Sequence, residues 1–212
     1  MRDFPVFTTE YGVASLTLRE VPYTARAYVV LRSSVQPELL LKECKEFCVA
    51  VGAKEIYASG DSILEAFPFH TSILKLQCLQ ASLGDTDAAL WPVTEETAER
   101  WRTMYNEKSV RIPNGAWLSQ RDLKDILKTD QAYFVHRGEC LLGTGLISGG
   151  EIRWVCSMQF GAGEEVVRAL AHAVTEEQIT VEVASENHKA MELYKRLGFL
   201  AVSELSKWYK IL

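Results

Sequence analysis

In the C-terminal half of the sequence, Gly161-Ala162-Gly163 form a glycine-rich corner that could bind an anion. They follow an apolar segment that we expect to be a strand, 151–158, and they precede a segment expected to be a helix, 164–174. Glycine lets the backbone approach a ligand closely and adopt a positive φ. The first N–H groups of a helix have no acceptors within the helix, and the helix dipole attracts anions to that end. The corner therefore suits a pyrophosphate, although a plain tight turn would use the same residues.

A second pattern occupies Val183–Phe199. Here an apolar strand is expected to end, Asn187 to cap the next helix, and Gly198 to follow its last turn. The stretch resembles the GNAT family (Gcn5-related N-acetyltransferases), whose corresponding segment reads V-x-x-x-N-x-x-A-x-x-L-Y-x-x-L-G-F. The residues that match in type and spacing are Val183, Asn187, Ala190, Leu193, Tyr194, Leu197, Gly198 and Phe199. The resemblance extends over residues 89–212 and is strongest after residue 150.

The resemblance implies a mixed α/β sheet of the GNAT acyl-CoA N-acyltransferase fold. It also implies that acetyl-CoA is the co-substrate and that its acetyl group moves to a primary amine of a small molecule or peptide. In the family, two strands part, and a backbone N–H at the end of one of them stabilises the oxyanion. The residues expected to contact the cofactor are Val155, Cys156, Ser157, Gly161, Ala162, Gly163, Glu164, Asn187 and Tyr194.

The catalytic roles follow from the same resemblance. Tyr194 matches the family tyrosine that gives a proton to the leaving thiolate, and a phenol with a pKa near 10 suits a thiol with a pKa of about 8.5. Asn187 would hold the pantetheine arm or the start of its helix. The base that takes the proton of the amine is not specified by the sequence, and Glu151, Ser157 and Glu182 are candidates by position.

One position departs from the family pattern. GNAT loops usually read R/Q-x-x-G-x-G/A, but Met158 stands where Arg or Gln is expected, and Gln159 is one position off. The anion contact would then rely on backbone N–H groups alone. A second hypothesis therefore stays open, in which the chain is a catalytically inactive GNAT-like binding or regulatory protein. Its N-terminal half would then bind a partner or form a homodimer.

The elements that must position these residues fall into two predicted domains. The polar, turn-rich segment Ser82–Asp87 is the best linker candidate, so we expect a small α/β domain over 1–86 and the GNAT domain over 87–212. The first domain would be a degenerate copy of a GNAT half. Its expected elements are strands at 12–18, 26–31, 55–58 and 70–79, a helix from Pro37 to Gly52 and a helical turn at 62–66.

In the second predicted domain, strands alternate with helices, as in a mixed sheet. Strands are expected at 89–93, 131–136, 140–147, 151–158, 179–183, 201–204 and 207–212. Helices are expected from about residue 95 to 108, and at 121–129, 164–174 and 187–197.

Composition narrows the class of protein. The chain is 48% hydrophobic and 24% charged, which is ordinary for a globular protein. Its net charge of −5 argues against a nucleic-acid partner and is compatible with a cationic substrate. Five cysteines at irregular spacing predict free buried thiols in a reducing compartment and no metal site. With no signal-peptide pattern and no apolar run of about 18 residues, we expect a cytoplasmic protein without a membrane segment.

Overall fold

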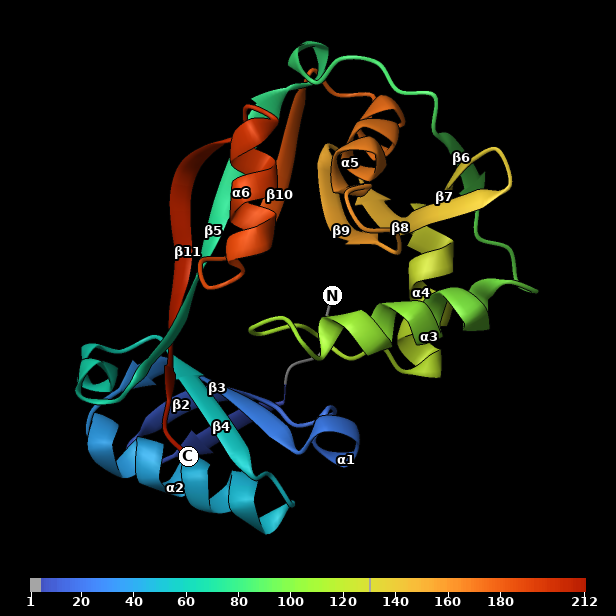
Figure 1. Cartoon of the computed structure of the whole chain (residues 1–212). Helices are drawn as coiled ribbons and strands as arrows, with labels where there is room; N and C mark the ends of the chain where they lie inside the picture. The colour runs from blue at the N-terminus through green and yellow to red at the C-terminus, as the bar shows by residue number, and fades with distance from the viewer. Residues whose placement is uncertain (1–4, 130) are drawn as a thin grey trace. The chain divides into compact units, whose positions relative to one another are not determined.

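The structure is a computed structural model that describes residues 5–129 and 131–212. It divides into two compact units (Figure 1). The N-terminal unit runs to Ser72 and also contains Leu205–Leu212, and the C-terminal unit is Ile73–Glu204. This division lies earlier than the boundary expected after residue 86. The reason is that β5 (Phe69–Leu79) pairs with β10 (Gln178–Ala184) from Ile73 to Leu79, which ties it to the later part of the chain.

The N-terminal unit is a small sheet covered by one long helix. Its strands are β1 (Val6–Thr9), β2 (Gly12–Thr17), β3 (Arg26–Ser34) and β4 (Glu55–Ser59), in that order across the sheet. The first three are antiparallel, and β4 is parallel to β3 through the crossover helix α2 (Pro37–Ala50). The short elements α1 (Val21–Thr24) and η1 (Ser62–Ala66) also belong to this unit, whereas η2 (Gln80–Ser82) follows β5 in the C-terminal unit.

Helix α2 forms where the apolar spacing predicts it. Pro37 lies in its first turn, and Gly52, at φ +97°, follows its end. Its buried residues include Cys44 and Cys48, and burial raises the pKa of the Cys44 thiol to about 12 and that of Cys48 to about 11. All five cysteines are free and four are buried, Cys140 being exposed. The prediction of free thiols is thus confirmed, and burial accounts for the protonated state of Cys44 and Cys48 at neutral pH.

The C-terminal unit contains a mixed sheet with the strand order β11-β5-β10-β9-β8-β7-β6. Besides β5 and β10, its strands are β6 (Ala89–Pro92), β7 (Gln131–Arg137), β8 (Cys140–Ser148), β9 (Glu151–Ser157) and the first part of β11 (Leu200–Lys210). Strands β6 to β9 form an antiparallel meander. The two strands expected at 201–204 and 207–212 are therefore one continuous strand, β11.

Helices cover both faces of this sheet. Neighbouring residues of β7 point to opposite faces, so Val135 lies in one core and Phe134 in another. The core around Val135 is formed with α5 (Gly163–His172) and α6 (His188–Arg196). The core around Phe134 is formed with α3 (Ala98–Ser109) and α4 (Gln120–Thr129). Within residues 5–129 and 131–212, no helix is long and apolar enough to cross a membrane.

Candidate functional site

Strands β9 and β10 are parallel neighbours that meet at their first residues and then separate. Their register pair is Glu151–Thr180, and the Thr180 N–H donates to the Gly150 carbonyl oxygen at 2.9 Å. From there to Ser157, β9 pairs with β8 on its other side. In the part of the chain that the structure describes, no later residue of β9 pairs with β10. The two strands therefore diverge toward their C-terminal ends, as the sequence comparison with the GNAT pattern leads us to expect (Figure 1).

At the end of β9, the backbone N–H groups point alternately toward β8 and toward this gap. The Met158 N–H donates to the Leu142 carbonyl oxygen of β8 at 2.7 Å. Because alternate residues of an antiparallel strand turn their peptide groups to opposite sides, Cys156 also faces β8. Val155 and Ser157 consequently turn their N–H groups toward β10. Of the three residues expected near the oxyanion, Val155 and Ser157 therefore turn their N–H groups to the gap, whereas Cys156 faces the β8 ladder and buries its side chain in the α3 core.

The glycine-rich corner follows directly. Gly161 has φ +83°, and a Cβ placed there would meet no atom within 4 Å, so the corner is open at this residue. The first helical hydrogen bond of α5 runs from Val166 N–H to the Ala162 oxygen at 3.0 Å. The N–H groups of Gly163, Glu164 and Glu165 therefore have no acceptor within the helix. Ala162 occupies the N-cap position and offers no side-chain oxygen to them.

The first turn of α5 carries two paired acids. The Arg196 Nε atom donates to Glu164 Oε1 at 2.9 Å, and Arg137 Nη1 lies 2.9 Å from Glu165 Oε2. The arginines are more than half exposed, at 59% and 57% of their side-chain surface. Acids in a first helical turn are stabilised by the dipole, but they also repel a bound anion. Sequence reasoning missed both arginines, because one ends β7 and the other ends α6, and nothing local links them to the corner.

Tyr194 lies in α6 with 6% of its surface exposed. Its ring centroid is 5.2 Å from that of Phe199, and both belong to the core beneath α5 and α6. Burial raises the pKa of Tyr194 above its ordinary value of 10.0. The phenol is therefore protonated at neutral pH, but it is a weaker acid than the sequence comparison assumes.

The other residues that the sequence suggests for catalysis or cofactor binding do not lie together in the structure. Asn187 caps α6 as predicted, accepting from the Ala190 N–H at 3.4 Å. Ser157 lies at the open end of the gap, on the α5 face of β9, because Cys156 faces α3. Glu182 is exposed and lies on the opposite face of β10 from Val181 and Val183, which pack under α5. Glu151 lies at the joined end, about 20 Å along β9 from Ser157.

Comparison with known proteins bears on the fold of this part of the chain. Residues 157–208 match the family model described as FR47-like protein. This match runs from the last residue of β9 through α5, β10 and α6 into β11, and so includes the glycine-rich corner. No curated protein matches the sequence at a significant level.

Solved structures share the fold over nearly the whole chain. A functionally unknown conserved protein from Staphylococcus epidermidis ATCC 12228 superposes with a TM-score of 0.64 at 13% identity, covering 98% of this chain and 93% of its own. A GCN5-related N-acetyltransferase from Kribbella flavida gives 0.60 at 11% identity, covering 99% and 89%. A tandem GNAT protein from the clavulanic acid biosynthesis pathway gives 0.54 at 12% identity, covering 94% and 78%. At these identities the likeness establishes the GNAT fold.

An open pocket of about 560 Å³ lies on the α3 side of this GNAT sheet, next to the end of β9. It is lined by Glu99, Arg100, Thr103, Met104, Glu107, Leu141, Met158 and Gln159. Its size falls within the usual range for small-molecule sites. The spacing of Glu99, Thr103 and Glu107 marks one face of a helix, but the sequence does not reveal that this face lines a pocket with Met158 and Gln159.

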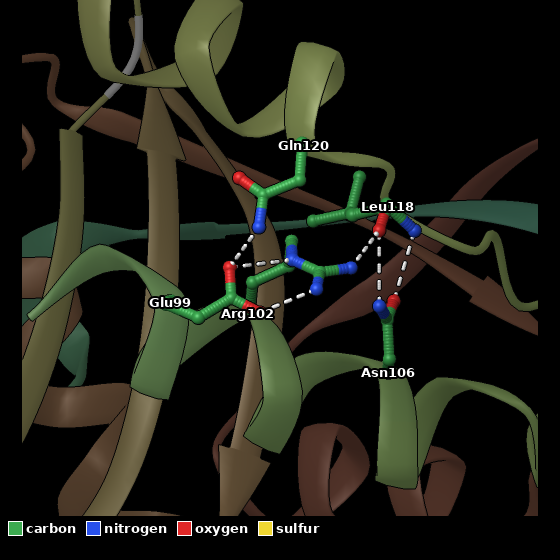
Figure 2. Close-up of polar contacts among 5 residues, drawn as sticks. All are labelled: Glu99, Arg102, Asn106, Leu118 and Gln120. Carbon is green, nitrogen blue, oxygen red and sulfur yellow. Dashed lines mark hydrogen bonds and ion pairs between the residues drawn. The ribbon is translucent and has the colours of Figure 1, made fainter.

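Glu99, one of the residues that line this pocket, belongs to a network of polar contacts that Figure 2 shows. The Glu99 carboxylate accepts from Arg102 Nε at 3.1 Å and from Gln120, and Arg102 lowers the pKa of Glu99. The Asn106 side chain makes two hydrogen bonds to the Leu118 backbone. Its Oδ1 atom accepts from the Leu118 N–H at 2.8 Å, and its Nδ2 atom donates to the Leu118 carbonyl oxygen at 3.0 Å. Arg102 Nη1 donates to the same oxygen at 3.0 Å. The segment that joins α3 to α4 is therefore bound to α3, and Glu99 is held ionised at the rim of the pocket.

Proposed function

We propose that the protein transfers an acetyl group from acetyl-CoA to a primary amine of a small molecule or a peptide. The observation that carries this proposal is the divergence of β9 and β10 beside the open corner at Gly161. The divergence leaves the peptide N–H groups of Val155 and Ser157 facing a gap rather than a neighbouring strand. Donors held in this way stabilise negative charge without reorganising.

Bound acetyl-CoA would supply an activated acyl group, and the chain's own residues would do the rest. The N–H groups at the start of α5 bind its phosphates. The N–H groups of Val155 and Ser157 donate to the acyl oxygen as the amine nitrogen forms its bond to carbon and negative charge develops. Tyr194 gives its proton to the sulfur when the carbon–sulfur bond breaks. Glu182 lies on the face of β10 that is opposite α5, and it is the best placed base. It takes a proton from the amine nitrogen, which balances the transfer.

We further propose that the amine acceptor occupies the pocket beside α3. Met104, Leu141 and Met158 give it apolar walls, while Glu99 and Glu107 place carboxylates on one side. Arg102 and Gln120 already neutralise and orient Glu99. Glu107 is exposed and is therefore the residue better suited to meet a cationic group.

The alternative, a GNAT-like protein without catalysis, is favoured by one feature of the corner. Segment 158–163 contains no charged residue, and Glu164 and Glu165 add negative charge just beyond it. If these acids prevented binding of a polyanion, the diverging strands would be a remnant of the family fold.

Calorimetric titration with acetyl-CoA distinguishes an active transferase from a GNAT-like protein without catalysis. We expect saturable binding in the micromolar range, followed by release of free thiol when the protein is supplied with a panel of primary amines. Absence of heat up to millimolar acetyl-CoA would contradict the transferase. Binding without thiol release from any amine, at protein concentrations near that of the cofactor, would favour the binding protein.

A further inference from the structure

The corner lacks a cation of its own, and two arginines from distant segments lie next to it. Segment 158–163 reads Met-Gln-Phe-Gly-Ala-Gly and contains no charged side chain. Arg137 comes from the end of β7 and Arg196 from the last turn of α6. Each reaches the first turn of α5, where each pairs with one glutamate at 2.9 Å.

We propose that Arg137 and Arg196 are phosphate-binding residues of the acyl-CoA site, held in position by Glu165 and Glu164 until the ligand arrives. This inference rests on the proposed function, because it assigns further residues to the same site. Arginine matches phosphate oxygens with a planar set of donors, and its charge survives at every pH of interest. Without ligand, the carboxylate oxygens of Glu164 and Glu165 occupy the arginine donors that would otherwise bind phosphate oxygens.

Exposure makes such an exchange of partners feasible. Both ion pairs lie at the surface, where an ion pair contributes little to stability, so little stability is lost when an arginine turns to a ligand. Glu165 receives both of its contacts from the same Arg137 nitrogen, at 3.0 and 2.9 Å, which leaves the other guanidinium nitrogen Nη2 outside those contacts. Arg196 likewise uses Nε on Glu164, so its terminal nitrogens are not engaged in that bond.

The position of α6 supports the role of Arg196. A Cβ on Gly163 would lie 3.1 Å from Leu193 Cδ2, so the middle of α6 packs directly on the first turn of α5. Arg196 is one helical turn beyond Leu193 and therefore projects next to the three N–H groups that α5 leaves without helical acceptors. Backbone donors and a guanidinium consequently adjoin the open corner at Gly161.

The experiment measures affinity for three probes by calorimetry, using the full chain. CoA carries a pyrophosphate and a 3′-phosphate, dephospho-CoA only the pyrophosphate, and pantetheine no phosphate. We expect Arg196→Gln and Arg137→Gln each to weaken CoA binding by about 5- to 30-fold and to leave pantetheine within twofold. A loss that persists with dephospho-CoA assigns the arginine to the pyrophosphate, and a loss that disappears assigns it to the 3′-phosphate. Arg121→Gln, at an exposed position of α4, is the matched control.

The glutamate partners give a test that a purely structural ion pair would fail. Glu164→Gln breaks the same pair as Arg196→Gln, but it removes negative charge beside the phosphates and should tighten CoA binding by about 2- to 5-fold. Opposite signs for the two variants therefore support the proposal, and equal losses of affinity would overturn it. So would a normal CoA affinity in both arginine variants, which would leave the proposed function intact. A wild-type protein that binds neither CoA nor acetyl-CoA would contradict the function and this inference together.

Discussion

Gly163 lies directly against Leu193, because a Cβ on the glycine would be 3.1 Å from the leucine Cδ2 atom. The contact joins the first turn of α5 to the middle of α6. One helix begins at the glycine-rich corner and the other contains Tyr194, so this contact fixes the distance between the two parts of the proposed site. A side chain at position 163 would meet Leu193, whereas Gly161, at φ +83°, has no atom within 4 Å of a Cβ placed on it.

Gly163→Val is expected to destabilise the protein by about 1–3 kcal/mol, because the larger side chain must displace Leu193. Leu193→Ala should relieve the clash, so the double variant should be more stable than the sum of the two single losses predicts. Urea unfolding followed by tryptophan fluorescence measures the three variants. Strict additivity would show that α5 and α6 do not meet at this contact.

Tyr194→Phe tests the proposed proton donor. We expect turnover to fall at least tenfold, since general acids contribute roughly 10²- to 10⁴-fold, while acetyl-CoA affinity is unchanged. Tyr133→Phe on β7, whose hydroxyl donates to Gln131, is the control and should leave turnover unchanged. Unchanged turnover in the Tyr194 variant would remove this residue from the mechanism.

The same tyrosine predicts a pH dependence of stability. Burial raises the folded-state pKa of Tyr194 above 10.0, so the folded state holds its proton more tightly than the unfolded state. Its contribution is fully present below pH 10 and is lost as the pH rises from 10 through the folded pKa. Urea midpoints measured between pH 8 and 11 should fall more steeply for wild type than for Tyr194→Phe. Equal slopes would indicate that the phenol is not buried.

Asn106 is the residue on which the link between α3 and α4 depends. It is 3% exposed and makes two hydrogen bonds to Leu118, so Asn106→Leu leaves a buried N–H without its acceptor. We expect a loss of about 2–4 kcal/mol and faster exchange of the Leu118 amide hydrogen. Gln120→Ala, which removes an exposed contact to Glu99, should cost less than about 0.5 kcal/mol. Unchanged exchange at Leu118 in the Asn106 variant would show that the segment is held by other contacts.

Glu107→Gln addresses the acceptor pocket. If this carboxylate meets the cationic group of the acceptor, the variant should raise the KM for the amine by about 3- to 10-fold without changing the affinity for acetyl-CoA. Glu96→Gln, an exposed acid outside the pocket lining, is the control. An increase confined to acetyl-CoA binding would place the pocket on the cofactor side instead.

Local sequence patterns predicted the helices and strands that form the candidate site. They did not predict the contacts between residues that are far apart in the sequence. The Asn187 cap, the β7–β8 hairpin and the strand–corner–helix order follow from spacing and from glycine and asparagine chemistry. The short strand β1 was missed because Val6–Thr9 is too brief to show a period. The arginines at 137 and 196 and the Leu118 anchor depend on segments that meet only after folding. The sequence also does not state which way each peptide group of a strand turns, so it could not separate Cys156 from Val155 and Ser157.

That orientation can be tested with proline, which removes a backbone N–H without needing a catalytic assay. Ser157 turns its N–H toward the gap, so Ser157→Pro should remove no ladder bond and should cost little stability. Cys156 faces β8 in the register with Thr144, so Cys156→Pro should break a ladder hydrogen bond and cost about 3 kcal/mol or more. Thermal unfolding compares the two variants, and thiol release measures what remains of turnover. We expect the Ser157 variant to fold and to lose most of its turnover, because one donor to the acyl oxygen is gone. A Ser157 variant as unstable as the Cys156 variant would show that β9 presents its other set of peptide groups to the gap.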